Sequence, residues 1–281
     1  MMRKYNYTDI IEKDFCEHEN LILFNLADTH VGNPFFNEKL FKETLETVKN
    51  IENAYIVLGG DLIENNTKNS VGSVYEQTMT PKDQRDYIVD YLQPLKHKIL
   101  GSVQGNHEHR KDNKNADNDV AEDIARMIGV PYNPYSLLFY LRIGKNPANK
   151  NRPISYSIFL RHGSGRGSTP ASAVNGSIKG ENIVLGCDVY FSGHHHQELA
   201  LLKTHNVFYQ QSKSIRTIDS LFIQTGSYID YGGYGAAGAM PPKSLGSKGV
   251  ILSGKKRSIS EISVDMVKLY FSSWHLPQNM I

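Results

Sequence analysis

Five short segments of this sequence carry side chains that bind divalent metal ions, and each of them follows an apolar run. The segments are Asp28-Thr29-His30, Gly60-Asp61, Gly105-Asn106-His107-Glu108, Arg161-His162-Gly163 and Gly193-His194-His195-His196. Carboxylate oxygen, amide oxygen and imidazole nitrogen, without thiolates, suit Mn, Fe or Zn. One such segment alone also fits a helix cap or a glycine turn. The presence of all five in one chain predicts a metal site.

Asp61, which follows two glycines at a tight turn, suits the place of a ligand shared by two metals. Two divalent ions about 3.5–4 Å apart repel each other, so they need a shared anionic ligand. Such a pair makes a strong nucleophile from water near neutral pH and holds a phosphoryl group for in-line attack. The pattern therefore indicates hydrolysis of a phosphoester.

The elements that position these segments are predicted to be strands, at 21–27, 54–58, 99–103, 154–160 and 184–191. In open α/β sheets, ligand sites lie beyond the carboxyl ends of the strands. We therefore expect the five polar segments to meet at one edge. Apolar residues at helical spacing predict helices at 37–51, at 83–98 with a kink at Pro94, and at 117–128.

The second half of the chain is mostly strand-like. Further strands are predicted at 136–143, 199–203, 207–211, 221–224 and 259–271. The segment 228–245 lacks periodicity and predicts a surface loop. A first half that alternates strand and helix, joined to a strand-rich second half, favours one mixed α/β domain. We expect a single domain over 1–281, with the motifs in about 20–230 and a loop plus C-terminal strands in 231–281.

The composition is that of a globular protein and excludes the collagen-like and disordered classes. Hydrophobic residues make up 40% of the 281 residues, and the net charge is +2. So small a charge provides no global field for nucleic acid or an acidic membrane, although a local basic patch is compatible with it. The lone cysteines Cys16 and Cys187 predict no disulfide. Without a signal peptide or an apolar span, a cytoplasmic protein with no membrane partner is expected. The oligomeric state is not indicated.

The five segments, in this order, resemble the motifs of the calcineurin-like metallophosphoesterase superfamily. Two of the motifs, Gly105-Asn106-His107-Glu108 and Gly193-His194-His195-His196, are similar to those of phage and bacterial members and, loosely, of DNA-repair exonucleases. The resemblance implies an α/β fold, a four-layer αββα sandwich with a dinuclear metal site at the strand ends. It also implies two divalent transition metals, of which Mn is the first expectation and Fe or Zn the alternatives.

The resemblance assigns roles to residues at the matching positions. One metal would be held by Asp28, His30, Asp61 and His196, and the second by Asp61, Asn106, His162 and His194. A hydroxide that bridges the metals would attack phosphorus. His107 matches a histidine that is not a ligand and that stabilises the developing charge or protonates the leaving group. Glu108, its neighbour, is expected to orient that imidazole and is counted with it as catalytic.

Substrate contacts are predicted less sharply. His109 and Arg110, after the Asn-His motif, and Arg166, in the glycine-rich stretch 162–170, are candidates for binding phosphate. A solvated loop is an equal alternative for His109 and Arg110, and a mobile lid or a plain turn is an equal alternative for the stretch with Arg166. Glu64 stands where many members of the superfamily have Asp, so its contacts are left open. His195 lies between two ligands and is expected to point away from the metals if the segment is extended.

The expected function is that of a metal-dependent phosphoester hydrolase. A phosphodiesterase or phosphatase, with an exonuclease as one form of it, would act on nucleic acid or a nucleotide. The alternative is a non-catalytic protein-binding scaffold on the same fold. Such scaffolds can lose metal ligands, whereas every expected ligand is present here. A metallo-β-lactamase is excluded because the sequence lacks its HxHxDH signature.

Overall fold

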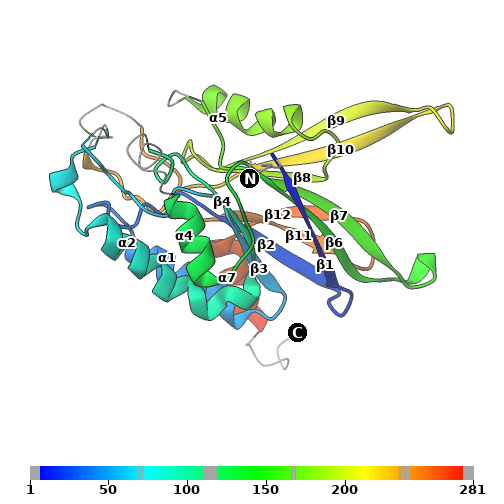
Figure 1. Ribbon diagram of the computed structural model, residues 1–281. Coiled ribbons are helices and arrows are strands. Elements are labelled where there is room, and N and C mark those ends of the chain that lie inside the picture. Colours follow the sequence, from blue (N-terminus) through cyan, green and yellow to red (C-terminus); the bar gives the residue numbers. More distant parts are fainter. Residues whose placement is uncertain are drawn as a thin grey trace, which may run out of the picture.

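The computed structural model describes residues 7–68, 70, 72–110, 119–165, 167, 169–233, 236 and 241–274. Within them, two six-stranded sheets pack against each other (Figure 1). The first sheet has the order β1 (Asp9–Phe15), β6 (Leu137–Asn146), β7 (Arg152–Leu160), β8 (Val189–Ser192), β10 (Ser214–Gln224) and β9 (Leu199–Tyr209). The second has the order β12 (Ile259–Ser263), β11 (Lys248–Ser253), β2 (Asn20–Leu26), β3 (Ala54–Leu58), β4 (Ile99–Val103) and β5 (Tyr132–Asn133).

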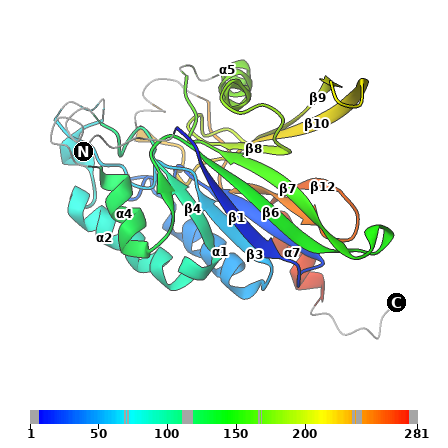
Figure 2. The same ribbon diagram turned by 45° about the vertical axis from the view of Figure 1, so that its right-hand side comes forward.

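Helices cover the outer faces of the two sheets unequally. The second sheet carries α1 (Glu38–Asn50), α2 (Pro81–Leu92), α4 (Val120–Ile128) and α7 (Val264–Trp274), whereas α5 (Pro170–Ser177) lies over the first (Figures 1 and 2). Short 3-10 helices are η1 (Val74–Glu76), η2 (Gln93–Lys98), η3 (Pro147–Asn149) and η4 (Ile178–Asn182). The order helix, sheet, sheet, helix confirms the predicted αββα sandwich.

The amphipathic pattern of α1 explains why it packs where it does. Its buried residues Phe41, Leu45 and Val48 recur every three or four positions, which is one face of a helix. The helix begins after Asn37, whose side chain accepts a hydrogen bond from the backbone N–H of Leu40 at 2.9 Å. The apolar face therefore meets the second sheet in a layer separate from the core between the sheets.

The strand directions bring several carboxyl ends together. In the second sheet β2, β3, β4 and β5 are parallel, and in the first sheet β7, β8 and β10 are parallel. The segments that follow β2, β3, β4, β7 and β8 are the five polar segments of the sequence. The fold thus provides the common edge that the strand ends predicted.

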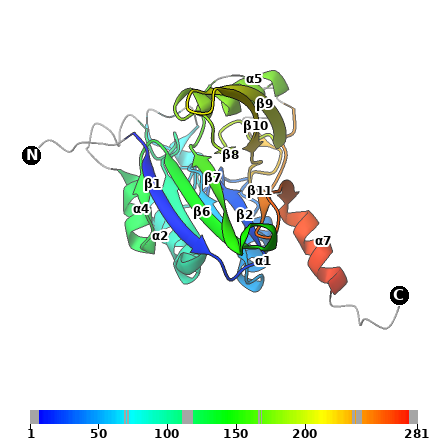
Figure 3. The same ribbon diagram turned by 90° about the vertical axis from the view of Figure 1, so that its right-hand side faces the viewer.

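The C-terminal strand prediction is wrong in its second half. The segment 259–271 forms β12 only up to Ser263 and then α7, because Val264 and Val267 bury one helical face while Met266 is exposed. Figure 3 shows α7 on the side of the sandwich opposite β1. The sequence also gave no indication of β1, β11 or α5, and the predicted strand 184–191 is shortened to β8.

The predicted strands 199–203, 207–211 and 221–224 are parts of one long hairpin. β9 and β10 pair in register from Leu199↔Gln224 to Tyr209↔Ser214. The hairpin extends from the body as an arm (Figures 1 and 2), and Leu202, Phe208 and Ile215 on it are exposed. Because much of the arm is solvated on both faces, its polar residues interrupted the apolar pattern used for the prediction.

Lys98 is a buried cation that closes the C-terminal end of α1. Its Nζ donates to the carbonyls of Val48 at 2.9 Å and Glu52 at 3.2 Å, as well as to that of Ile51. Carbonyls at the end of a helix carry partial negative charge and lack intrahelical donors. Lys98 therefore joins α1 to the start of β4.

The change Lys98→Met is expected to lower the free energy of unfolding by about 2–3 kcal/mol, since it removes charge-assisted hydrogen bonds and leaves buried carbonyls unpaired. Urea denaturation measures it. Lys96→Met, at an exposed position of the same 3-10 helix, is the control and should change stability by less than about 0.5 kcal/mol. Equal effects of the two changes would contradict this role of Lys98.

No helix within the described residues is long and apolar enough to span a bilayer.

Candidate metal centre

The first group of donors joins Asp28 and His30, after β2, to His196, after β8. Nε2 of His30 and Nε2 of His196 lie 3.1 Å apart, and Nε2 of His196 lies 3.3 Å from Oδ1 of Asp28. One donor atom from each residue falls within 4.8 Å of the others. Ligands about 2.1 Å from one cation are separated by distances of this order. The three residues fit one metal ion.

The second group joins Asp61, after β3, to His162 and His194, after β7 and β8. Oδ2 of Asp61 lies 3.1 Å from Nε2 of His162. Oδ1 of Asn106, after β4, lies 3.1 Å from Nε2 of His162 and 2.6 Å from Nδ1 of His194. Both sheets therefore contribute to this group.

The backbone is left-handed at five of the seven donor residues. The φ angles are 53° at Asp28, 49° at His30, 52° at Asp61, 76° at His194 and 55° at His196. Residues with a Cβ adopt this region rarely, at a cost of about 1–3 kcal/mol each, and such strain gathers at functional sites. Its concentration on the donor residues supports a functional role for the cluster.

Close approach between the ends of β3 and β4 requires glycine. A Cβ on Gly105 would lie 2.1 Å from the backbone nitrogen of Asp61 and 2.2 Å from its Oδ1. Gly60, with φ of 86°, faces Gly105 across the same gap. The glycines of the two motifs thus allow Asp61 and Asn106 to reach one centre.

In three of the histidines, one ring nitrogen lies near an oxygen outside the donor groups, and this contact determines which nitrogen faces the metal centre. Nδ1 of His30 lies 3.1 Å from Oε2 of Glu64. Nδ1 of His162 lies 2.8 Å from the carbonyl oxygen of Gly59, and Nε2 of His194 lies 2.9 Å from that of Gly165. An N–H donated to these oxygens leaves the other ring nitrogen free to bind a cation.

The charges of the centre match a cation. Attraction by neighbouring histidines outweighs burial and lowers the pKa of Asp28 and of Asp61. Burial opposes the charged form of the histidines, yet Glu64 raises the pKa of His30 to about 9 and Asp61 raises that of His162 to about 10. Protons thus occupy these imidazoles in the metal-free protein. Buried carboxylates, an amide and imidazoles converging without thiolates fit divalent metal ions.

Metal binding is expected to release protons at pH 7.5. With pKa values of about 9 and 10, His30 and His162 are protonated at that pH and must lose a proton to bind a cation. The affinity should therefore rise as the pH increases from 7 to 9. Calorimetric titration with Mn in buffers of different ionisation enthalpy measures the release. A binding enthalpy that is the same in every buffer would contradict the prediction.

His107 and Glu108 differ in their surroundings from what the sequence suggested. Glu108 is buried, and its carboxylate accepts hydrogen bonds from the backbone N–H groups of Asp61 at 3.0 Å and Leu62 at 2.6 Å. It holds the turn after β3. Nδ1 of His107 instead faces Glu64, at 2.8 Å from its carbonyl oxygen and 3.8 Å from Oε1. The expected orientation of His107 by Glu108 is corrected accordingly.

No family model and no curated protein matches this sequence. Similar solved structures include a metallophosphoesterase from Sphaerobacter thermophilus, with a TM-score of 0.38 and 14% identity over 92% of this chain and 95% of that chain. For the nuclease MPE of Pseudomonas putida, the TM-score is 0.34 and the identity 12%, over 85% of this chain and 87% of that chain. For Vacuolar Protein Sorting 29 of Cryptosporidium parvum, the TM-score is 0.40 and the identity 15%, over 87% of this chain and 98% of that chain.

The two packed sheets, with the ordered polar segments at their common edge, are the architecture that the resemblance seen in the sequence implied. The chain folds as an αββα sandwich with two groups of metal-binding side chains at the strand ends.

The remaining candidate residues differ in where the structure places them. His109 is exposed in the turn after Asn106, whereas Arg110 is half-buried against Glu64 and Asn66. Arg166 lies outside the described residues. His195 is buried and packs against the glycine loop and α5, where a Cβ on Gly176 would lie 2.5 Å from its Nε2. Its segment is not extended, because both flanking histidines have positive φ.

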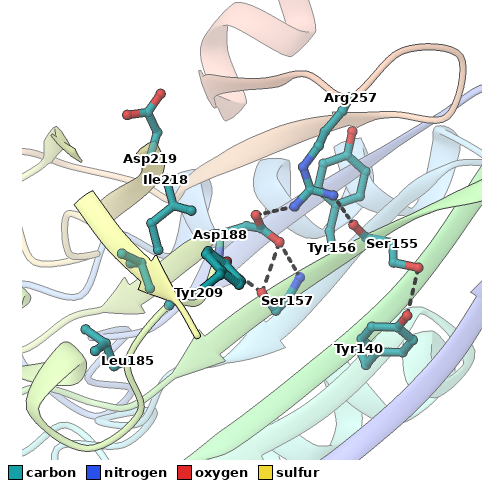
Figure 4. Close-up of a pocket in the computed structure, with 12 residues that line it drawn as sticks. Tyr140, Ser155, Tyr156, Ser157, Leu185, Asp188, Tyr209, Ile218, Asp219 and Arg257 are labelled. Atoms are coloured by element: carbon teal, nitrogen blue, oxygen red, sulfur yellow. Dashed lines mark hydrogen bonds and ion pairs between the residues drawn. The ribbon is translucent and has the colours of Figure 1, made fainter. Parts of the chain in front are cut away.

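A separate cavity of about 550 Å³ lies between β6, β7 and the β9–β10 hairpin. Tyr140, Tyr209 and Leu185 line it, and Asp188 within it is paired with Arg257 and with Ser157 (Figure 4). None of its lining residues belongs to the donor groups. The two donor groups thus lie outside this cavity, at the strand ends.

Proposed function

We propose that this protein is a metal-dependent phosphoester hydrolase. The observation that carries the proposal is the convergence of two donor groups, built from five strand ends, on one edge of the sandwich. Asp28, His30, Asp61 and His196 would hold one metal, and Asp61, Asn106, His162 and His194 the other. The influence of His30 as well as His162 on the pKa of Asp61 supports a shared role for this carboxylate.

Two divalent ions bound there would act as Lewis acids on the phosphoester and activate a water molecule. The chain itself provides the orientation. Backbone N–H groups of His194 and His107 donate to the carboxylates of Asp28 and Asp61, at 2.9 and 2.7 Å. The carboxylates therefore keep their position without a cation, and the site is preorganised.

His107 is the residue that we assign to the transition state. Its Nδ1 contacts Glu64 and Arg110. The other ring nitrogen, Nε2, is left to hydrogen-bond a phosphoryl oxygen or the leaving group. A third cluster of His30, Glu64 and His107 also falls within 4.8 Å. The guanidinium of Arg110, 2.7 Å from Nδ1 of His107, already places a positive charge there and disfavours a metal.

We propose nucleic acid or a nucleotide as the substrate class. The test is a panel assayed with added Mn: an aryl phosphomonoester, an aryl phosphodiester, cyclic nucleotides, and single- and double-stranded DNA. Turnover of a diester or of DNA is expected. Turnover of the monoester alone would contradict the substrate class, and metal uptake without turnover of any compound would favour the protein-binding scaffold.

A further inference from the structure

Two groups in contact with Nδ1 of His107 make opposite demands on that atom. The carbonyl oxygen of Glu64 lies 2.8 Å from Nδ1 and can only accept a hydrogen bond. Nη2 of Arg110 lies 2.7 Å from the same atom and can only donate one. A neutral imidazole carries a single N–H, so the choice made at Nδ1 decides whether Nε2 has a proton or a lone pair.

Arg110 is the stronger of the two partners. A hydrogen bond from a charged donor is roughly twice as strong as one between neutral groups. A proton on Nδ1 would point an N–H at a guanidinium N–H, which is repulsive. Nη2 has two hydrogens for three acceptors, so one N–H is shared between Nδ1 and the carbonyl of Glu64, 3.0 Å from Nη2, and the carbonyl keeps a partner when Nδ1 accepts. Asn66, whose Oδ1 lies 2.9 Å from Nη2, holds the guanidinium in place.

The carboxylate nearest to His107 is occupied elsewhere. Oε2 of Glu64 lies 3.1 Å from Nδ1 of His30 and accepts from Nδ2 of Asn33 at 3.0 Å. Its other oxygen, Oε1, is 3.8 Å from Nδ1 of His107, beyond hydrogen-bond range. A carboxylate within hydrogen-bond range of Nδ1 would favour a proton on that atom. Because the carboxylate of Glu64 bonds to His30 instead, Arg110 determines the tautomer of His107.

We propose that Arg110 is a positioning residue that sets the tautomer of His107, with the lone pair on Nδ1 and the proton on Nε2. The inference rests on the proposed function, in which Nε2 meets the phosphoester. A neutral imidazole in this form donates a hydrogen bond to a phosphoryl oxygen and keeps its proton. Arg110 then acts through His107 and not on the phosphate, which revises the substrate contact expected from the sequence.

The tautomer is measured directly by long-range ¹H–¹⁵N correlation spectra of the metal-free protein labelled with ¹⁵N-histidine, with His107 assigned from His107→Ala. We expect Nε2–H in the wild type and Nδ1–H, bonded to Glu64, in Arg110→Ala. Arg110→Lys keeps a charged donor and should restore Nε2–H, and His109→Ala, at an exposed neighbour, should leave the tautomer of His107 unchanged. A wild-type spectrum with Nδ1–H overturns the proposal, as does Nε2–H in Arg110→Ala.

Kinetics on a substrate from the panel provide a second readout. Arg110→Ala should lower kcat by about 10- to 100-fold with little change in KM, and Arg110→Lys should recover part of the loss. A rise in KM at unchanged kcat would mean that Arg110 binds the phosphate, and would overturn the positioning role. The spectra need neither metal nor substrate, so absence of turnover would overturn the proposed function and leave the tautomer result standing.

Discussion

Replacing Asp61 by asparagine is expected to weaken metal binding by at least about 100-fold and to abolish turnover. The change keeps the size of the side chain but removes a fully ionised carboxylate whose Oδ2 lies 3.1 Å from Nε2 of His162. Loss of a partner of a ligand already costs 10- to 100-fold in affinity or activity, and loss of a ligand proposed to serve both metals costs at least as much. Calorimetric titration with Mn and metal analysis of protein purified without chelator measure the effect.

The control is Asp219→Asn, at an exposed position of the β10 arm. This change removes the same charge from the chain without touching the donor groups, so it should leave the metal content unchanged. Retention of wild-type metal affinity in Asp61→Asn would exclude Asp61 as a ligand.

The change His107→Ala is expected to leave the metal content at the wild-type level and to lower turnover by about 10²- to 10⁴-fold. The imidazole belongs to neither of the two donor groups assigned to metals, and the bond that His107 gives to Asp61 comes from its backbone N–H, which alanine retains. Turnover and metal content are measured on the same preparation. Unchanged turnover would remove His107 from the mechanism.

The change Glu108→Gln, in contrast to His107→Ala, is expected to lower both stability and metal affinity. Its amide nitrogen would replace one of the two oxygens and face the backbone N–H of either Asp61 or Leu62, so the free energy of unfolding should fall by about 1–3 kcal/mol. Thermal or urea unfolding measures the change, and metal affinity should fall with it because this turn carries Asp61. Lost turnover at unchanged stability would instead support the catalytic role that the sequence suggested for Glu108.

The positions of the donor residues in the fold were largely predictable, because the strands before them are short apolar runs ended by polar residues. The ranges 54–58 and 99–103 coincide with β3 and β4. Parallel strands end at one edge, so motifs far apart in the sequence meet there. This rule needs only residue types and order, both of which the sequence contains.

The surroundings of His107 were not predictable, because they depend on which way side chains turn. Glu108 is next to His107 in the sequence and yet faces the turn after β3, while Glu64 and Arg110 reach the imidazole. The exposed arm and α7 were missed for another reason. The polar residues of the solvated arm interrupt its apolar pattern, and Ile262, Val264 and Met266 alternate with polar residues across the start of α7, as in a strand.

The left-handed backbone conformation lowers the stability of the protein at five donor residues, Asp28, His30, Asp61, His194 and His196. Glycine adopts this conformation without strain, so at each of these positions a mutation to glycine would relieve the backbone while deleting a donor. Random substitution filtered only for folding would therefore tend to erase the centre. Five strained backbone positions, each bearing a donor side chain, are therefore expected only where the centre itself is under selection.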